Sequence, residues 1–389
     1  MTITRDDALQ LDAADPLAHL RERFDIPDGV VYLDGNSLGA PPRGVADALA
    51  AFAGDWRRDL IHAWGTAGWG TLAARLGGRI ARLIGAAADE VIVTDTTSGN
   101  LFKLLVAACR MRPGRSTVLI EAANFPSDLY IAQGVCELLG LELGYLDEGA
   151  PIDETVAVVV HSHVDFRTGA IADMAGLTER AHAAGALTLW DLCHSAGAIP
   201  VDLTAAGADL AVGCTYKYLN GGPGSPAYAY VAKRLQDQVR QPITGWGGHA
   251  RRFAMTRGFE PAPGPARLQV SQAPVIGMVA LDAALDAFDG VTVEALRDKA
   301  VSLGELFVAL AAERLPGLKP ASPGDPLARG SQVSFAHPEA ERILAAVAEH
   351  GVIADFRPPE TMRFGFAPLY LRHVDVYDAV RRIADVMSA

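Results

Sequence analysis

Chemically active side chains cluster in one stretch of the chain, where two short apolar runs are each followed by polar residues. Asp191 and His194 follow the first run, and Tyr216 and Lys217 follow the second. Both runs have the length and composition of buried strands, and ligands bind at the carboxyl ends of strands in an open α/β sheet. A carboxylate, an imidazole and an amine at one edge suit pyridoxal 5'-phosphate (PLP), whose aldehyde needs a lysine and whose pyridinium nitrogen needs an acid partner.

Taken alone, each of these residues has a simpler explanation, since a Lys after a strand is often solvated and an Asp there often caps a helix. A second signal comes from residues 90–110, where a strand is followed by a helix that begins at Thr97 or Ser98. Free backbone N–H groups at such a helix start form a phosphate site, although Ser and Thr are also ordinary N-caps. Phe125 is held extended by the following proline, so its ring could lie against a planar ligand. Core packing for Phe125 and N-capping for Asp128 are the alternatives.

Composition and charge indicate a globular protein and argue against several other classes. The chain has 389 residues, of which 50% are hydrophobic and 21% charged, which predicts a globular protein with a large core and two domains. Its formal net charge of −12 argues against a nucleic-acid partner. The four cysteines show no metal-ligand spacing and are expected to be reduced thiols of a cytoplasmic protein. The acidic N-terminus lacks the apolar core of a signal peptide, and no apolar run is long enough to cross a bilayer.

The elements needed to position these residues follow from hydrophobic periodicity. Apolar strands alternate with amphipathic helices from about residue 90 to 231, which predicts an α/β domain with a mainly parallel sheet. From residue 272 onward, long helices and fewer strands indicate a smaller α+β domain. We therefore expect an N-terminal arm at 1–40, a large cofactor-binding domain at 41–265 and a small C-terminal domain at 266–389.

The order and spacing of these features resemble PLP-dependent enzymes of the aspartate-aminotransferase fold, in the class V branch, and within that branch the kynureninases. The resemblance spans nearly the whole chain and implies fold type I, the PLP-dependent transferase-like fold, with a mainly parallel seven-stranded sheet in the large domain. The motifs that carry it are Y-L-D-G-N-S-L-G (32–39), F-P-S-D (125–128), D-L-C-H-S-A-G (191–197), Y-K-Y-L-N-G-G-P-G (216–224), G-W-G-G-H (245–249) and R-F-G-F-A-P-L-Y (363–370).

The resemblance implies a role for each residue around the cofactor. Lys217 would hold PLP as a Schiff base and later move protons, Asp191 would pair with the pyridinium nitrogen, and Phe125 would stack on the ring. Further cofactor contacts fall to Thr97, Ser98, Asp128, Ser162, His194 and Tyr216, with Trp246 and Gln272 reaching the phosphate from the second subunit of a homodimer.

The resemblance also implies the reaction, which is hydrolysis of the Cβ–Cγ bond of L-kynurenine to anthranilate and L-alanine in tryptophan degradation. Arg363 would bind the substrate α-carboxylate in bidentate geometry, although a surface ion pair is its alternative from pattern alone. Trp64 would face the aromatic ring, and Tyr216 would act as proton donor or relay. The 3-hydroxy derivative of L-kynurenine is a further candidate substrate.

Two positions depart from the family pattern. Gln272 stands where the family has a smaller Asn or Thr, and we expect it to crowd the 3-position of the substrate ring and favour unsubstituted L-kynurenine. Gly247 stands where the family has a bulky apolar residue, and we expect it to widen or loosen its loop. Both departures concern substrate preference rather than reaction class.

Three other functions compete with this interpretation. A cysteine desulfurase or selenocysteine lyase of the same fold needs a cysteine on a mobile loop, but no cysteine follows Cys214. A class V aminotransferase, or another PLP-dependent lyase acting on a related amino acid, stays open because it shares the ring chemistry. A PLP-binding regulator without turnover is expected to carry a helix-turn-helix, which neither end of this sequence offers.

Overall fold

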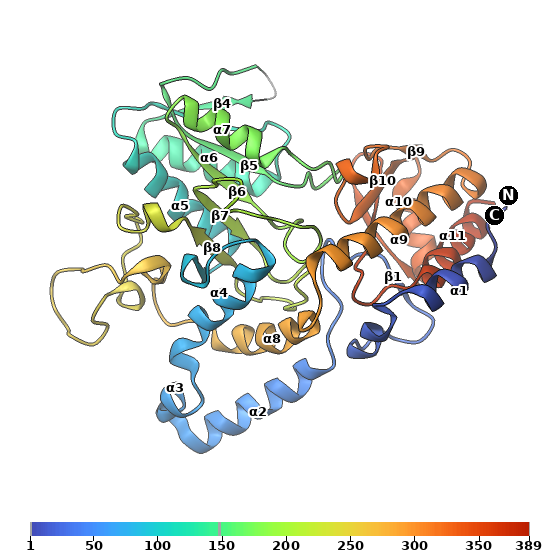
Figure 1. Ribbon diagram of the computed structural model, residues 1–389, viewed down its shortest axis with the longest axis horizontal. Helices are drawn as coiled ribbons and strands as arrows, with labels where there is room; N and C mark the ends of the chain where they lie inside the picture. The colour runs from blue at the N-terminus through green and yellow to red at the C-terminus, as the bar shows by residue number, and fades with distance from the viewer. Residues whose placement is uncertain (1, 147–148, 389) are drawn as a thin grey trace.

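The computed structural model describes residues 2–146 and 149–388 and has two lobes side by side (Figure 1). The larger lobe is built on a seven-stranded sheet in which β8 runs antiparallel to both of its neighbours and all other neighbouring strands are parallel. This confirms the predicted α/β fold class. The strand order is β2 (Val91–Val93), β8 (Tyr228–Val231), β7 (Leu210–Gly213), β6 (Leu187–Asp191), β5 (Val156–Ser162), β3 (Thr117–Ile120) and β4 (Glu142–Tyr145).

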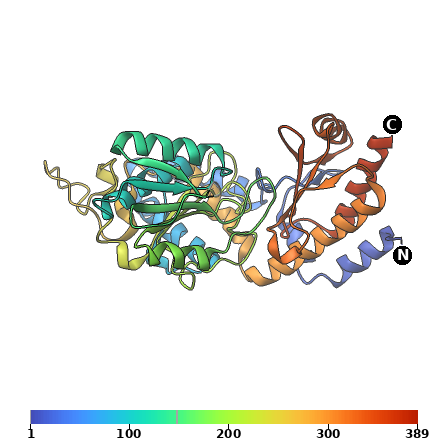
Figure 2. The same ribbon diagram turned by 90° about the horizontal axis from the view of Figure 1, so that it is seen from above.

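Helices cover both faces of this sheet (Figure 2), which explains why its central strands are continuous apolar runs rather than alternating ones. All five residues of β6 are buried, as are all four of β7. The helices packed on this sheet include α4 (Leu72–Leu83), α5 (Thr97–Met111), α6 (Pro126–Leu139) and α7 (Met174–Ala183). Because four neighbouring strands, β7, β6, β5 and β3, run parallel, their carboxyl ends lie at one edge of the sheet.

The smaller lobe contains a four-stranded antiparallel sheet in the order β12 (Asp355–Arg357), β13 (Thr361–Gly365), β10 (Gln332–Ala336) and β9 (Lys319–Pro320). Phe307 packs on Phe364 of this sheet with ring centroids 4.5 Å apart. The helices of this lobe are α9 (Val293–Arg314), α10 (Ala340–Glu349) and α11 (His373–Ser388).

The N-terminal segment packs on the smaller lobe, so both ends of the chain belong to this lobe (Figure 1). Helix α1 (Arg5–Ala14) packs on α11, and β1 (Val31–Tyr32) pairs in parallel with β11 (Val352–Ile353). The chain then crosses to the larger lobe through the D-G-N-S-L-G loop. The boundaries expected at residues 40 and 265 stay predictions.

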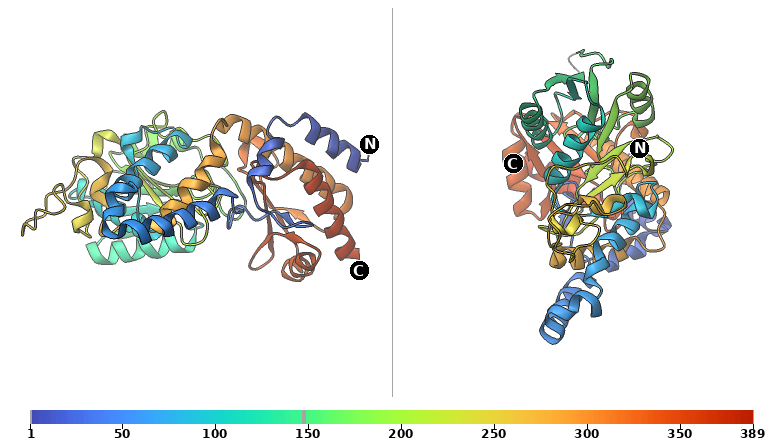
Figure 3. Two further views of the ribbon diagram at one scale, coloured as in Figure 1. Left: turned by 90° about the horizontal axis from the view of Figure 1, so that it is seen from below. Right: turned by 90° about the vertical axis from the view of Figure 1, so that its left-hand side faces the viewer.

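Helix α2 (Gly44–Asp59) has no buried residue and projects from the body of the protein together with α3 (Ala63–Thr66) (Figure 3). It packs on α8 (Val275–Leu285). Large apolar side chains remain exposed on and beside this pair of helices, namely Trp56, Leu60, Ile61 and Ile276. Among the helices described, none has the length and apolar character needed to cross a membrane.

Candidate active site

A hollow opens at the carboxyl ends of the parallel strands, around Lys217. Asp191 is the last residue of β6 and Ser162 the last of β5, while Lys217 follows the end of β7. Strand order therefore brings together residues that are far apart in the sequence. Nine of the residues expected to bind the cofactor line this hollow: Thr97, Ser98, Phe125, Asp128, Ser162, Asp191, His194, Tyr216 and Lys217.

The amine of Lys217 lies near two aromatic rings and is hydrogen-bonded to His194. Its Nζ is 2.9 Å from Nε2 of His194 and 5.9 Å from the ring centroids of both Phe125 and Tyr216. Burial, and then the positive charge of Lys217, hold the pKa of His194 well below its usual range. The imidazole is therefore neutral, and its Nε2 accepts a hydrogen bond from the Lys217 ammonium.

Two carboxyl groups share the interior of the hollow. Asp128 and Asp191 are 2% and 7% exposed, and Oδ1 of Asp191 accepts a hydrogen bond from the backbone N–H of Cys193 at 2.7 Å. Burial raises the pKa of Asp128 well above its usual range, and the neighbouring Asp191 carboxylate raises it further. Two buried carboxylates in contact need either a proton or a cation between or beside them.

The hollow fits PLP by this charge pattern. Among the described residues, Oδ2 of Asp128 and Nδ1 of His194 are buried without a hydrogen-bond partner. A protonated pyridine nitrogen supplies the donor and the positive charge that the carboxyl pair lacks, and a ring hydroxyl or formyl oxygen can pair with the imidazole. Lys217 is placed to bind the aldehyde.

The start of α5 lies at the wall of the hollow, where a phosphate group is expected. Its N-cap is Thr96, whose hydroxyl accepts a hydrogen bond from the N–H of Gly99 at 3.1 Å, and the helix begins at Thr97. Thr97 and Ser98 line the hollow, so the free N–H groups and the positive end of the helix dipole lie at its wall. Burial raises the pKa of Tyr216, which keeps this phenol protonated.

The D-G-N-S-L-G loop joins the lysine loop to the smaller lobe. The N–H of Gly39 donates to the carbonyl of Tyr216 at 2.7 Å, and a Cβ at position 39 would lie only 2.3 Å from the carbonyl oxygen of Lys217. At the other end, the N–H of Gly365 donates to the carbonyl of Leu33 at 2.7 Å. Glycine is needed at position 39 because the two backbones touch there.

Arg363 lies on β13 next to this loop and is 1% exposed. Its Nη1 donates to the carbonyl of Phe166, a residue that lines the hollow, at 2.6 Å. Its Nη2 donates to the hydroxyl of Ser37 at 3.0 Å and is ion-paired with Asp355. Burial lowers the pKa of Arg363 to about 10, so the guanidinium is charged at neutral pH.

Sequence reasoning missed the residues that support the site from outside. The side-chain oxygen of Asn124 accepts hydrogen bonds from the Ser162 hydroxyl at 2.7 Å and from the N–H of Phe125 at 2.6 Å, and so fixes both. Ser37, Phe166 and Asp355 were likewise not assigned. Ser37 belongs to the D-G-N-S-L-G motif, but its partner Arg363 is 326 positions away in the sequence, so the motif alone does not show its role.

Three predicted residues lie away from the hollow around Lys217. Trp64 and Gln272 line a separate apolar hollow of about 530 Å³ beside α2 and α8. Trp246 is 43% exposed and lines a third hollow, with its ring 5.9 Å from that of Phe253. Within one chain the structure does not bring these three side chains to Lys217.

The expectation that Gly247 loosens its loop is wrong. Gly247 is buried, and a Cβ there would lie 2.5 Å from the carbonyl oxygen of Ser271. The loop thus packs its backbone directly against the segment that leads to Gln272. A bulky residue at position 247 would push the two segments apart, so glycine tightens this contact.

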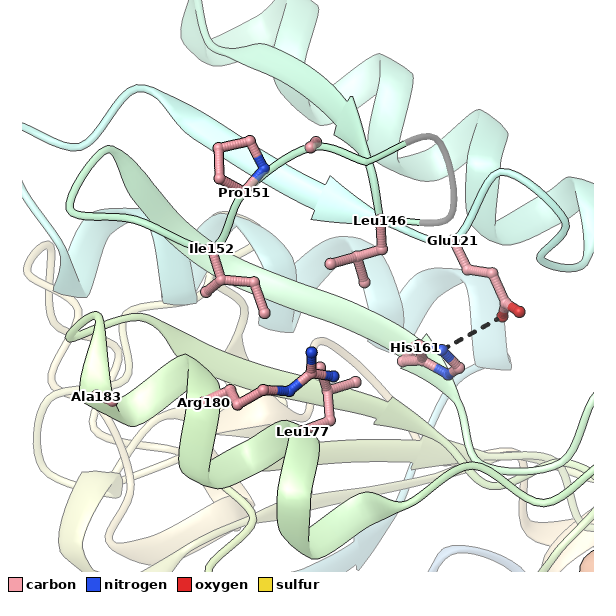
Figure 4. Close-up of a pocket in the computed structure, with 9 residues that line it drawn as sticks. Glu121, Leu146, Pro151, Ile152, His161, Leu177, Arg180 and Ala183 are labelled. Atoms are coloured by element: carbon pink, nitrogen blue, oxygen red, sulfur yellow. Dashed lines mark ion pairs between the residues drawn. The ribbon is translucent and has the colours of Figure 1, made fainter.

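A further hollow of about 590 Å³ lies between α7 and the strands β4 and β5 (Figure 4). Its polar side chains include Arg180 and His161, whose Nε2 is 3.7 Å from an oxygen of Glu121. None of the residues expected to bind cofactor or substrate lines it. Nine of the expected cofactor contacts line the smaller hollow around Lys217 instead.

Comparison with known proteins agrees with the geometry. Residues 296–383 match the family model described as the kynureninase C-terminal domain. The kynureninase of Burkholderia mallei is 50% identical over 99% of this chain and 96% of its own length, and that of Pseudomonas fluorescens is 48% identical over the same shares.

Solved structures show the same fold at low identity. The cysteine desulfurase CsdA of Escherichia coli has a TM-score of 0.81 at 19% identity, covering 96% of this chain and 98% of its own. A variant of C-DES with glycine covalently linked to its PLP cofactor has a TM-score of 0.81 at 17% identity, covering 94% and 99%. These likenesses support the fold alone, whereas the identity of about 50% along the whole chain shows the family. The chain belongs to the kynureninase family of PLP-dependent hydrolases.

Proposed function

We propose that the protein, with PLP bound at Lys217, hydrolyses the Cβ–Cγ bond of L-kynurenine and releases anthranilate and L-alanine. The observation that carries this proposal is the convergence of nine expected cofactor contacts on one hollow around Lys217. Family membership then selects this reaction among those that PLP supports.

PLP, when bound, supplies a ring that accepts the electrons left at the substrate's α-carbon. Asp191 keeps a proton on the ring nitrogen through its negative charge. Lys217, once free, is the base that takes the Cα proton, because it alone among the described lysines lines the hollow. His194 lies 2.9 Å from that amine and orients it by accepting a hydrogen bond. Because the imidazole is neutral, it does not repel the positive charge of the protonated amine.

Tyr216 is the proton donor for the later steps. Its raised pKa keeps the phenol protonated, and the Lys217 amine lies 5.9 Å from the centroid of its ring, so both groups can serve the same reacting atoms. Arg363 binds the α-carboxylate and so fixes the substrate's orientation. Asn124 holds Phe125 in place for stacking.

The active form in this proposal is a homodimer whose active sites lie at the interface. Trp246 and Gln272 do not reach the hollow of their own chain, and apolar side chains are exposed around α2 and α8. Because Trp64 lines the same hollow as Gln272, the two side chains serve the same active site, that of the partner subunit. Four free cysteines agree with a cytoplasmic location.

Gln272 sets the preference for unsubstituted L-kynurenine in this proposal. The hollow that it shares with Trp64 is mainly apolar, and a pocket discriminates strongly for a hydroxyl only when it is built to hydrogen-bond it. We expect Gln272→Asn to raise kcat/KM for 3-hydroxy-L-kynurenine relative to L-kynurenine. An unchanged ratio, or a native preference for the hydroxylated substrate, removes Gln272 as a determinant of specificity.

The reaction is tested by incubating purified holoenzyme with L-kynurenine and measuring anthranilate and alanine together. Equal amounts of both products support the proposal. Consumption of L-kynurenine by amino transfer to a 2-oxo acid, without anthranilate, would instead identify a class V aminotransferase.

A further inference from the structure

Both terminal nitrogens of the Arg363 guanidinium, Nη1 and Nη2, already contact groups of the protein itself. Nη2 contacts both the hydroxyl of Ser37 and Oδ2 of Asp355, and Nη1 donates to the carbonyl of Phe166. Its Nε is buried and, among the described residues, has no hydrogen-bond partner. The side chain is therefore held in place but not saturated.

A carboxylate binds a guanidinium in bidentate fashion through two neighbouring N–H groups on one edge. The two available edges are Nε with Nη2, and Nη1 with Nη2. Nη2 belongs to both edges, and its two hydrogens are already directed at Ser37 and Asp355. Neither edge is free for a substrate carboxylate until one of these two partners moves.

Asp355 is the partner that can move, because it has a second cation to receive it. Its Oδ2 is 3.1 Å from Nε and 3.0 Å from Nη2 of Arg357, and it also accepts a hydrogen bond from Ser37 at 2.9 Å. Arg357 is 37% exposed, whereas Arg363 is 1% exposed. Both Asp355 and Arg357 belong to β12, a three-residue strand at the edge of its sheet, where the backbone is least constrained.

We propose that Asp355 is an internal competitor for the substrate's α-carboxylate: it occupies Arg363 in the free enzyme and passes to Arg357 when substrate binds. This inference rests on the proposed role of Arg363 in the function above. The arrangement keeps the buried guanidinium paired when no substrate is present, since an unpaired buried charge is costly. It also selects for amino acids, because an amine without a carboxylate cannot replace Asp355 on Arg363.

The test compares Asp355→Asn with the native holoenzyme, using L-alanine and ethylamine as ligands followed by the absorbance of the bound cofactor. The variant keeps the shape of the side chain and loses its charge. We expect the Kd of L-alanine and the KM of L-kynurenine to fall about tenfold, which corresponds to about 1.4 kcal/mol, with little change in kcat. The Kd of ethylamine, which lacks the carboxylate, should not change.

Arg357→Gln gives the opposite prediction, because Asp355 then loses its alternative cation and competes more strongly for Arg363. We expect weaker L-alanine binding in this variant, while a merely structural role for β12 would move both variants in the same direction. Asp385→Asn, which removes an exposed helical ion pair with Arg381, is the matched control and should bind like the native enzyme.

Weaker L-alanine binding in Asp355→Asn, or equal changes for L-alanine and ethylamine, would overturn the proposal. Should Asp355→Asn fail to fold, the Arg357→Gln comparison decides, and unchanged or tighter L-alanine binding there counts against the proposal. Failure of the proposed function gives a different result from failure of the Asp355 proposal. In that case the native enzyme forms no anthranilate, while the ligand affinities of the variants still show whether Asp355 competes for Arg363.

Discussion

Charges buried around Lys217 are only partly balanced by the protein's own residues. Asp128 has its pKa raised by burial and by Asp191, so in the absence of another cation the pair holds a proton. His194 is kept neutral. Two neighbouring buried carboxyls beside a neutral imidazole suit a cationic ring nitrogen, and Asp191 is the residue expected to pair with it.

We predict that Asp191→Ala lowers kcat by about 100-fold or more, the scale of one lost electrostatic contact in a buried site. Asp191→Asn should lose a similar factor, because its amide cannot hold a proton on the ring nitrogen. Steady-state turnover of L-kynurenine at saturating PLP measures both.

The two substitutions separate chemistry from folding. Only Asp191→Ala also removes the acceptor for the N–H of Cys193, so it alone should lower the free energy of unfolding, by about 1–3 kcal/mol. Turnover of Asp191→Asn near the native value would mean that Asp191 is only a structural cap.

At the scale of residues, sequence reasoning found the side chains that strand ends and motifs identify directly. Asp191 and Lys217 could be placed because each comes after a buried apolar run, and Arg363 because its motif is distinctive. Ser37 and Asp355 could not be assigned, because each acquires its role from the other across 318 positions. Contacts of that kind depend on how the lobes pack, which no local pattern encodes.

Among elements, the D-G-N-S-L-G loop is the one that ties the lysine loop to the strand carrying Arg363. It contacts the backbone of Lys217 at one end, and the segment leading into it contacts Gly365 near the other. Its glycine at position 39 is therefore a requirement of close backbone approach rather than of flexibility.

We predict that Gly39→Ala lowers activity although it adds only one methyl group. A Cβ at position 39 would lie 2.3 Å from the Lys217 carbonyl oxygen and must displace the loop that carries Lys217. The expected loss in kcat/KM is about tenfold to 100-fold, the range that small misplacements of reacting groups produce. Gly44→Ala is the control, since nothing lies within 4 Å of a Cβ there. Equal activity of the two variants would mean that the loop does not position Lys217.

Element prediction succeeded where burial was complete and failed where it was partial. The strands from 156 to 231 were recognised as apolar runs because both faces of the sheet are covered. Strand β4 was missed because none of its four residues is fully buried, which leaves no clear apolar pattern. The apolar residues 30–32 predict the short strand β1, but its pairing with the distant β11 has no signal in the sequence.

For the whole molecule, the exposed apolar surface around α2 and α8 is the main feature that one chain leaves unexplained. The hollow beneath α2 holds Trp64 and Gln272, which the proposed function assigns to the partner's active site. Subunits that share active sites in this way can complement one another.

We predict that co-expressing Lys217→Ala chains with Trp64→Ala chains restores about a quarter of native activity, because half of randomly formed dimers are mixed and each mixed dimer has one intact site. Each variant alone should be impaired. Purification through two different tags isolates the mixed dimers, in which the activity should rise to about half of the native value. No restoration, or full activity in a sedimenting monomer, would contradict shared sites.

The proposed function requires that Lys217 carries PLP in the hollow at the edge of the seven-stranded sheet. Borohydride reduction of the holoenzyme followed by peptide mass spectrometry tests it most directly, because reduction fixes the cofactor to the lysine that holds it. We expect the label on the peptide containing Lys217, and neither label nor anthranilate formation in Lys217→Ala. Label on Lys103 or Lys299, which are buried and ion-paired with Asp95 and Asp15, or native anthranilate formation in Lys217→Ala, would contradict the account.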